Sequence, residues 1–315
     1  IVLDANESAG FNFRENNEIG YHWPGGAWWW TSGLVAPAGE WSHVAMVVTP
    51  TGITIYVNGE SVTNAFTASE VALKSQFIGS YKNWGGRNML GKVDEVKIWN
   101  RSLSEGEIRQ QRHINLSVSD VASDADLLSY FQFNEDIYYL VNKKPGALNG
   151  YFSGGANLAL SEAPVGGGAC DIFNLSGGGI YPTPNCGGSI EVSEGALTPQ
   201  GEVVFNRIDV TPSSSPNNHV SESGFWIIDT YGNGGDGASI DPIIAWNMVS
   251  VNTAFDGFAS PASELNLLYR ATNSSGPWAV LCSGDTEVNA INAFAVSAGG
   301  GCGISMSGQF VLSGL

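Results

Sequence analysis

The sequence from Trp41 to Glu60 constrains the fold more than any other segment. It contains two runs of β-branched and aromatic residues, Trp41 to Val48 and Ile53 to Val57, separated by Thr-Pro-Thr-Gly and followed by Asn58-Gly59. Short branched runs bounded by turn residues are typical of adjacent antiparallel strands. Lys92 to Trp99 predicts a further strand, because its apolar residues recur closer to every second position than to a helical period.

One short helix is expected. Ser104-Glu-Gly-Glu107 has the spacing of a capping box, and Ile108 begins an apolar-then-polar run behind it. We therefore expect a helix that starts at Ser102 or Ser104, and no other helix in the chain.

Composition predicts an all-β protein of two antiparallel β-sandwich domains. The chain has 41 glycines and 10 tryptophans, and glycine suits tight turns while aromatic rings suit the inner faces of sheets. In its second half, strands are expected at 201–210, 224–230, 243–251, 264–269, 277–282 and 308–312. Their spacing indicates a second sandwich.

Charge divides the chain and limits its partners. Beyond Lys144 only Arg207 and Arg270 stand against fourteen acids, so this part carries −12 of the net −17. With the Pro- and Gly-rich stretch near Pro164, this predicts a first domain at 1–160, a linker at 161–169 and a second domain at 170–315. An acidic surface disfavours nucleic acid and anionic membranes, and no segment is long enough to insert into a membrane.

The four cysteines form two local pairs, Cys170 with Cys186 and Cys282 with Cys302. Without a Cys-x-x-Cys motif or a neighbouring histidine cluster, we interpret them as two disulfides, although four cysteines allow three connectivities. Disulfides predict an oxidising compartment, so we expect a secreted or cell-surface protein. Buried free thiols are the alternative.

The motifs of the first hundred residues resemble the laminin-G-like jelly roll of concanavalin A type, which includes pentraxin-like modules. The matching elements are Trp41-x-His-Val, Ile55-Tyr-Val-Asn-Gly59, Phe77-Ile-Gly79 and Gly91-Lys-Val-Asp-Glu-Val-Lys-Ile-Trp-Asn-Arg101 before Leu-Ser-x-x-Glu-Ile. The resemblance implies a concanavalin A-like jelly roll that binds rather than catalyses. Residues 126–135, 161–168 and 308–314 are similar to sequences in large secreted bacterial surface proteins with type IX secretion architecture.

The resemblance starts partway into the family's jelly roll, so the N-terminal strands of the fold would be missing. It implies that an upstream polypeptide or another chain completes the first sheet, or that the first domain is shorter than the family's.

Tyr21 to Trp30 is the most site-like stretch, because flat aromatic faces beside a glycine turn can stack on sugars. Tyr21, Trp23 and Trp29 are the candidate ligand-binding residues. Packing in the core is the competing interpretation for most of these rings.

Metal and catalytic motifs are weak. Asp229, Asn233, Asp236 and Asp241 lie in a glycine-rich loop that could wrap calcium, although a metal-free hairpin loop is the favoured interpretation. Asp94 is expected to accept backbone hydrogens at a strand-to-helix corner. No carboxylate pair of a glycosidase and no nucleophile motif occurs, so we expect no enzyme activity and no required cofactor, with calcium as an optional ion.

These features predict a secreted adhesion or recognition protein that binds extracellular glycan or a surface protein. The alternatives are a spacer or docking module in a large exported protein or secretion complex, and a carbohydrate-binding appendage of an extracellular enzyme.

Overall fold

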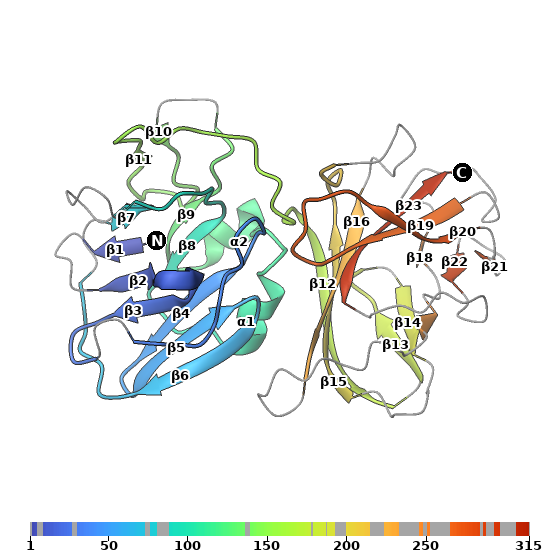
Figure 1. Ribbon diagram of the computed structural model, residues 1–315, viewed down its shortest axis with the longest axis horizontal. Coiled ribbons are helices and arrows are strands. Elements are labelled where there is room, and N and C mark those ends of the chain that lie inside the picture. Colours follow the sequence, from blue (N-terminus) through green and yellow to red (C-terminus); the bar gives the residue numbers. More distant parts are fainter. Residues whose placement is uncertain are drawn as a thin grey trace. The chain divides into compact units, whose positions relative to one another are not determined.

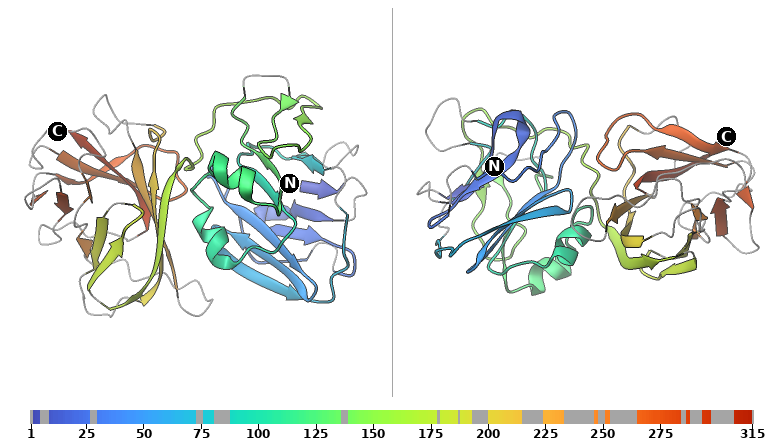
Figure 2. Two further views of the ribbon diagram at one scale, coloured as in Figure 1. Left: turned by 180° about the vertical axis from the view of Figure 1, so that it is seen from behind. Right: turned by 60° about the horizontal axis from the view of Figure 1, so that its bottom comes forward.

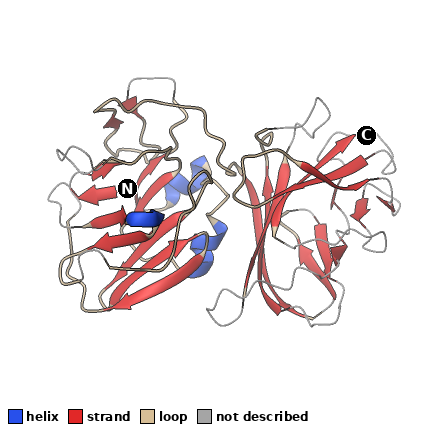
Figure 3. Ribbon diagram, in the orientation of Figure 1, coloured by secondary structure: helices blue, strands red, loops and turns tan. Residues whose placement is uncertain are grey.

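The fold is described from a computed structural model of the 315-residue chain. The description covers residues 2–4, 9–26, 30–72, 76–80, 88–135, 139–177, 179–186, 188–192, 200–214, 224–232, 246–247, 251–252, 265–283, 286–287, 293–296 and 307–314. Nearly all of its regular structure is strand, as Figure 3 shows. The all-β prediction is confirmed.

The chain divides into two compact units. The first comprises Ile1–Ile108 and Leu116–Ala163, and the second comprises Arg109–Asn115 and Pro164–Leu315. This division differs from the predicted ranges, because the short segment Arg109–Asn115 groups with the second unit. The predicted linker also contains structure, since Gly166 bridges to Ile114 and the first long strand of the second unit begins at Gly168.

The first unit contains two principal antiparallel sheets. One has the order β3-β2-β1-β7 and the other β4-β5-β6, while β8 pairs with β9 and β10 with β11. The bounds are β1 Val2–Asp4, β2 Gly10–Phe13, β3 Ile19–His22, β4 Val44–Thr49, β5 Gly52–Val57, β6 Glu60–Ala65, β7 Gln76–Ile78, β8 Val96–Trp99, β9 Leu127–Phe131, β10 Tyr139–Leu140 and β11 Gly150–Tyr151. The strands predicted from Trp41 to Val57 and before Trp99 are confirmed within a few residues.

The two principal sheets pack face to face, and the layers are visible in Figure 2. Ile19 and Tyr21 of β3 share one buried cluster with Ile53 and Ile55 of β5. All four of these side chains are fully buried. Because alternate residues of a strand point to one face, the branched and aromatic residues of each strand can meet across the sandwich.

The helices differ in number from the prediction. The expected helix is α1, Glu105–Gln110, and Ser104 accepts from the Glu107 amide at 3.3 Å while the Glu107 carboxylate accepts from the Ser104 amide at 2.7 Å. The expectation that no other helix exists is wrong. A second helix, α2 at Val118–Ser123, begins with a capping box between Ser117 and Asp120, and a single 3-10 turn, η1, spans Glu15–Asn17.

The second unit is built on a six-stranded antiparallel sheet with the order β12-β15-β16-β23-β19-β20 (Figure 1). Two three-stranded sheets, β13-β14-β17 and β18-β22-β21, accompany it. The bounds are β12 Gly168–Ser176, β13 Gly179–Thr183, β14 Gly188–Val192, β15 Gln200–Ile208, β16 Phe225–Tyr231, β17 Trp246–Asn247, β18 Val251–Asn252, β19 Leu265–Arg270, β20 Ala279–Ser283, β21 Thr286–Glu287, β22 Ala293–Val296 and β23 Gly308–Gly314.

One face of the six-stranded sheet forms the core of the second unit. Its buried cluster is Ile208, Phe225, Ile227, Leu268, Trp278 and Val311. Ile114, from the segment Arg109–Asn115, packs against this cluster. The segment also makes backbone hydrogen bonds, Asn115 N to Gly166 O at 2.8 Å and Gly166 N to His113 O at 3.0 Å. Arg109–Asn115 is therefore an integral part of the second unit.

Among the residues that the structure describes, none of the helices has the length and apolar character needed to cross a membrane.

Candidate functional site

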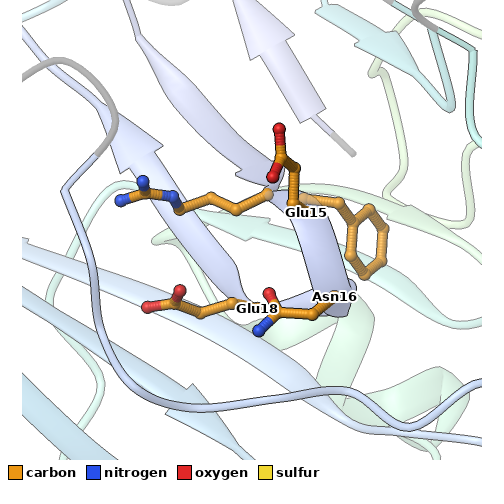
Figure 4. Close-up of a pocket in the computed structure, with 5 residues that line it drawn as sticks. Glu15, Asn16 and Glu18 are labelled. Carbon is orange, nitrogen blue, oxygen red and sulfur yellow. The ribbon is translucent and has the colours of Figure 1, made fainter.

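A polar pocket of about 670 Å³ lies at the turn between β2 and β3 of the first unit. It is lined by Phe13, Arg14, Glu15, Asn16 and Glu18. Figure 4 shows Glu15, Asn16 and Glu18 around it, with the carboxylates of the two glutamates pointing in different directions. The lining offers one aromatic ring together with donors and acceptors of hydrogen bonds.

The backbone at this turn is unusual. Asn16 and Asn17 have φ values of 63° and 62°, in the left-handed region that non-glycine residues seldom occupy. Asparagine tolerates this conformation better than most residues, because its short side chain can bond locally. The turn is closed by a hydrogen bond of 2.8 Å from Arg14 N to Glu18 O. Backbone strain of this kind is concentrated at functional sites, so it supports a role for the turn.

Two charged side chains fix the walls of the pocket. The buried Glu18 accepts a hydrogen bond of 2.7 Å from Gly33 N to its Oε1, and Arg14 donates to Thr31 Oγ1. Glu15 and Asn16 are exposed. Glu18 and Arg14 are thus held by hydrogen bonds, while the Glu15 carboxylate and the Asn16 amide are exposed and can contact a ligand. Such a set suits a ligand rich in hydroxyl groups, which both donate and accept.

Two of the predicted ligand-binding aromatics lie in the core instead. Tyr21 is 0 % exposed and Trp23 is 7 % exposed, so neither ring face can stack on a sugar. Tyr21 packs against Trp30 and Phe66, and its hydroxyl accepts a hydrogen bond of 2.7 Å from Asn64. The prediction was wrong for both because Tyr21 lies on β3, which is buried along its length, and Trp23, directly after β3, joins the same core cluster. Trp29 lies outside the described residues.

The predicted calcium loop is not supported at its first residue. Asp229 of β16 is buried and engaged within the protein, 2.7 Å from the Arg112 guanidinium and 3.0 Å from His113 Nε2. A carboxylate satisfied in this way has no role left in an exposed loop site. Asn233, Asp236 and Asp241 lie outside the described residues. In the part of the chain that is described, no group of three or more His, Cys, Asp or Glu side chains could hold a metal ion.

A dense network surrounds Asp229. Arg112 also donates to Tyr231 Oη at 3.1 Å and to Asn273 Oδ1 at 2.5 Å, and His113 Nδ1 lies 2.7 Å from Pro164 O. Arg109 pairs with Glu202 at 2.9 Å and lies over the Tyr231 ring at 4.0 Å. Burial together with the charge of Asp229 raises the pKa of Tyr231 above its usual range. This network fastens Arg109–Asn115 to β15 and β16, which makes it structural.

The cysteine prediction is also corrected in part. Cys170 and Cys186 are free thiols, and the Cys186 thiol lies 3.4 Å from Ala169 O and 3.3 Å from Phe205 O. Burial is the main cause that raises the pKa of Cys170 to about 12, and it raises that of Cys186 further. Only the backbone of Cys282 is described, in β20, and Cys302 lies outside the described residues.

A second polar cluster occupies the start of β8 in the first unit. Asp94 accepts from Glu95 N at 2.9 Å, which is the role predicted for it, and Tyr130 donates its hydroxyl to Glu95 Oε2. Burial raises the pKa of Glu95 to about 7, and burial lowers that of Lys97 to about 8. Burial likewise raises the pKa of Asp94. The carboxylates adjoin the strand pairing of β8 with β9 and serve the fold.

The pocket residues Phe13 to Glu18 were missed from the sequence. Their signal was the polar run Arg14-Glu-Asn-Asn-Glu18 between two short strands, where paired asparagines indicate a left-handed turn. The prediction instead favoured the aromatic residues from Tyr21 onward, because aromatic rings are the more familiar signal of a sugar-binding site.

Comparison with known proteins assigns part of the chain. Residues 1–109, about a third of the sequence, match the laminin G model of the concanavalin A-like lectin/glucanases superfamily. No curated protein and no solved structure gives a significant match. The matched segment contains β1 to β8 and the pocket, and the motifs that predicted a jelly roll all lie within it. The match therefore supports a laminin-G-type jelly roll over residues 1–109.

Proposed function

We propose that the protein is a non-catalytic recognition protein of the cell surface that binds extracellular glycan through the pocket at the β2–β3 turn. Laminin-G and concanavalin A-like domains commonly bind glycans or proteins, and the pocket lies within the segment that matches this superfamily. The observation that carries the proposal is the strained turn at Asn16 and Asn17, which presents Glu15 and Asn16 to solvent beside the Phe13 ring.

The chemistry of the pocket favours hydroxyl-rich ligands. Glu15 accepts hydrogen bonds, Asn16 donates and accepts them, and the Arg14 guanidinium donates. Sugars present closely spaced hydroxyls that need both kinds of partner. A catalytic role is not proposed, because Asp94 and Glu95 are engaged by Glu95 N and by Tyr130 within the fold.

The test is binding of the whole protein to an array of polysaccharides and matrix proteins, with calcium and again with chelator. The variant Asn16→Gly removes the amide but keeps the left-handed backbone, and Glu15→Gln removes one charge at constant shape. Combined, they are expected to weaken glycan binding about tenfold or more, a loss of about 1.4 kcal/mol or more. Asp126→Asn, an exposed carboxylate between α2 and β9, is the matched control and is expected to bind normally.

Unchanged binding in the combined variant would remove the pocket as the site. Failure of the wild-type protein to bind any glycan or matrix protein would overturn the recognition role itself. Sensitivity to chelator would show that calcium takes part.

A second candidate function is docking within a larger assembly. All six residues of β4 are uncharged and half-buried, and among the described strands β4 pairs only with β5. Soluble proteins normally protect such an edge with charges or proline, so this edge suits pairing with a strand from another polypeptide. Amide exchange at Val44–Val48 that is equally fast in this chain and in a longer parent polypeptide would exclude this function.

A further inference from the structure

Two exposed tyrosines face each other on the short ribbon formed by β10 and β11. Tyr139 is 49 % exposed and Tyr151 is 80 % exposed. They are direct partners in the antiparallel register, so their Cβ atoms are expected to lie about 5 Å apart on one face of the ribbon. Figure 1 shows this ribbon at the margin of the first unit, apart from the two principal sheets.

The opposite face of the ribbon belongs to the protein interior. Leu140 is 8 % exposed and pairs with Gly150, where an added Cβ would stand only 3.4 Å from Leu140. Since side chains alternate along a strand, burial of Leu140 turns Tyr139 outward. The same alternation directs Tyr151 away from Gly150. The tyrosine pair is therefore presented to solvent by the packing of its neighbours.

Asn142 anchors the ribbon to β9. This residue is 8 % exposed, and its Oδ1 accepts from Tyr130 N at 3.0 Å and from Lys144 N at 3.1 Å. Its own amides donate to the loop, Asn142 N to Asn149 Oδ1 at 2.9 Å and Asn142 Nδ2 to Leu148 O at 3.2 Å. The tyrosine pair thus stands on a fixed support, and a preorganised surface loses less entropy when it binds.

The sequence that follows the two lysines of the ribbon is uncharged over a long stretch. The sequence from Pro145 to Ser161 contains no charged residue. The two preceding lysines are turned to internal partners, because Lys143 pairs with Glu135 and Lys144 Nζ donates to Val121 O at 3.1 Å and Asp124 O at 2.6 Å. This uncharged stretch gives a polyanion or a polycation little to bind.

We propose that Tyr139 and Tyr151 form a stacking platform for a neutral polysaccharide. Two adjacent aromatic faces match the apolar faces of consecutive sugar rings, and the exposed Asn149, two residues before Tyr151, can donate to their hydroxyls through its side-chain nitrogen. A folded protein partner needs roughly 800 Å² on each side, far more than two strands of two residues supply. The inference rests on the proposed glycan-binding role and adds a second site for it, outside residues 1–109.

The test is calorimetric titration of the whole protein with neutral oligosaccharides of mixed-linkage β-glucan, xyloglucan and galactomannan, with heparin and alginate as polyanions. The variant pair Tyr139→Ser with Tyr151→Ser is expected to lower the affinity for at least one neutral oligosaccharide about tenfold or more. Tyr139→Phe with Tyr151→Phe keeps both rings and is expected to stay within about threefold of wild type. Leu148→Ser, at an 89 % exposed position of the same ribbon, is the matched control and is expected to bind normally.

The outcomes separate this platform from the pocket. Neutral-glycan binding that survives the double serine variant but is lost with Asn16→Gly and Glu15→Gln would overturn the platform and leave the proposed function standing. Wild-type protein that binds only a matrix protein or a polyanion would also overturn it. Loss of neutral-glycan binding in the double serine variant alone would establish the platform. The thermal unfolding of that variant must match wild type, so that the loss is not caused by unfolding.

Discussion

The two units hold their buried charges in opposite ways. In the second unit, Arg112 and Asp229 have side chains only 5 % and 3 % exposed, and each carries several partners around a 2.7 Å ion pair. In the first unit, Glu95 and Lys97 are half-buried, and burial moves the pKa of each toward neutrality, to about 7 and about 8. In the second unit, hydrogen bonds and an ion pair offset the cost of burying the charges. In the first unit, that cost shifts the pKa values of Glu95 and Lys97 so that both groups are less fully charged near neutral pH.

The difference teaches that burial alone does not decide how a charged group behaves. The Asp229 carboxylate is held by an ion pair with Arg112, whereas the Glu95 carboxylate, with only a tyrosine donor, gives up its charge near neutral pH. The second unit should therefore be sensitive to loss of a partner, and the first unit to the concentration of protons.

Removal of a partner in the second unit is expected to have the largest effect. Arg112→Met leaves the Asp229 carboxylate buried without its arginine partner and should lower the free energy of unfolding by about 3–5 kcal/mol. Urea unfolding gives the magnitude, and amide exchange in β16 gives the location. Arg207→Met removes the exposed pair with Asp209 and is the control, with a loss of about 0–1 kcal/mol. Equal losses in the two variants would erase the contrast between the units.

The first unit is expected to be least stable near pH 7–8. The raised pKa of Glu95 stabilises the fold at pH below its usual value, and this stability is lost as pH rises toward 7. The lowered pKa of Lys97 acts in the opposite sense, since its stability is present above the usual lysine value and is lost as pH falls toward 8. From pH 7 to pH 5 we expect a gain of about 2 kcal/mol.

Two variants test the contributions of Glu95 and Lys97 to this pH dependence separately. Glu95→Gln should remove the gain in stability below pH 7, and Lys97→Met should remove the gain above pH 8. Amide exchange in β8 and β9, measured across pH, follows both changes. An unchanged pH profile in Glu95→Gln would show that another group controls it.

Removal of a helix cap is expected to have the smallest effect on stability, because the hydrogen bonds of the caps are exposed. Ser104→Ala and Ser117→Ala each remove a side-chain acceptor at a helix start and should cost about 1 kcal/mol. Ser153→Ala, an exposed position outside the helices, should change the unfolding midpoint very little. A cap variant as costly as Arg112→Met would mean that burial adds nothing to these interactions.

Local patterns predicted the strands well. Branched runs between turn residues located β4, β5, β15, β16, β19 and β23 to within a few residues. The helix α2 was missed because its capping box uses Ser117 and Asp120 instead of a glutamate, and because it spans only six residues. The strands that were located and the helix that was missed both depend on residues that are close together in sequence.

Long-range features were beyond the sequence. Nothing in Arg109–Asn115 indicates that it packs on β15 and β16, because its partners lie about a hundred residues away. Tyr21 and Trp23 could be ligands or core by their residue type, and only the pairing of sheets decides between these roles. The exposed Tyr139 and Tyr151 were overlooked for the same reason, since exposure depends on what covers a strand.

The membership of Arg109–Asn115 in the second unit bears on how the chain folds during its synthesis. Arg112 is made 117 residues before Asp229, which corresponds to roughly 6–23 s of translation. During that interval the remaining sequence of the first unit, Leu116–Ala163, is made, while the buried partners of Arg112 do not yet exist. The buried ion pair of Arg112 with Asp229 can therefore form only after β16 has been made, so the second unit cannot complete this network until the chain has grown that far.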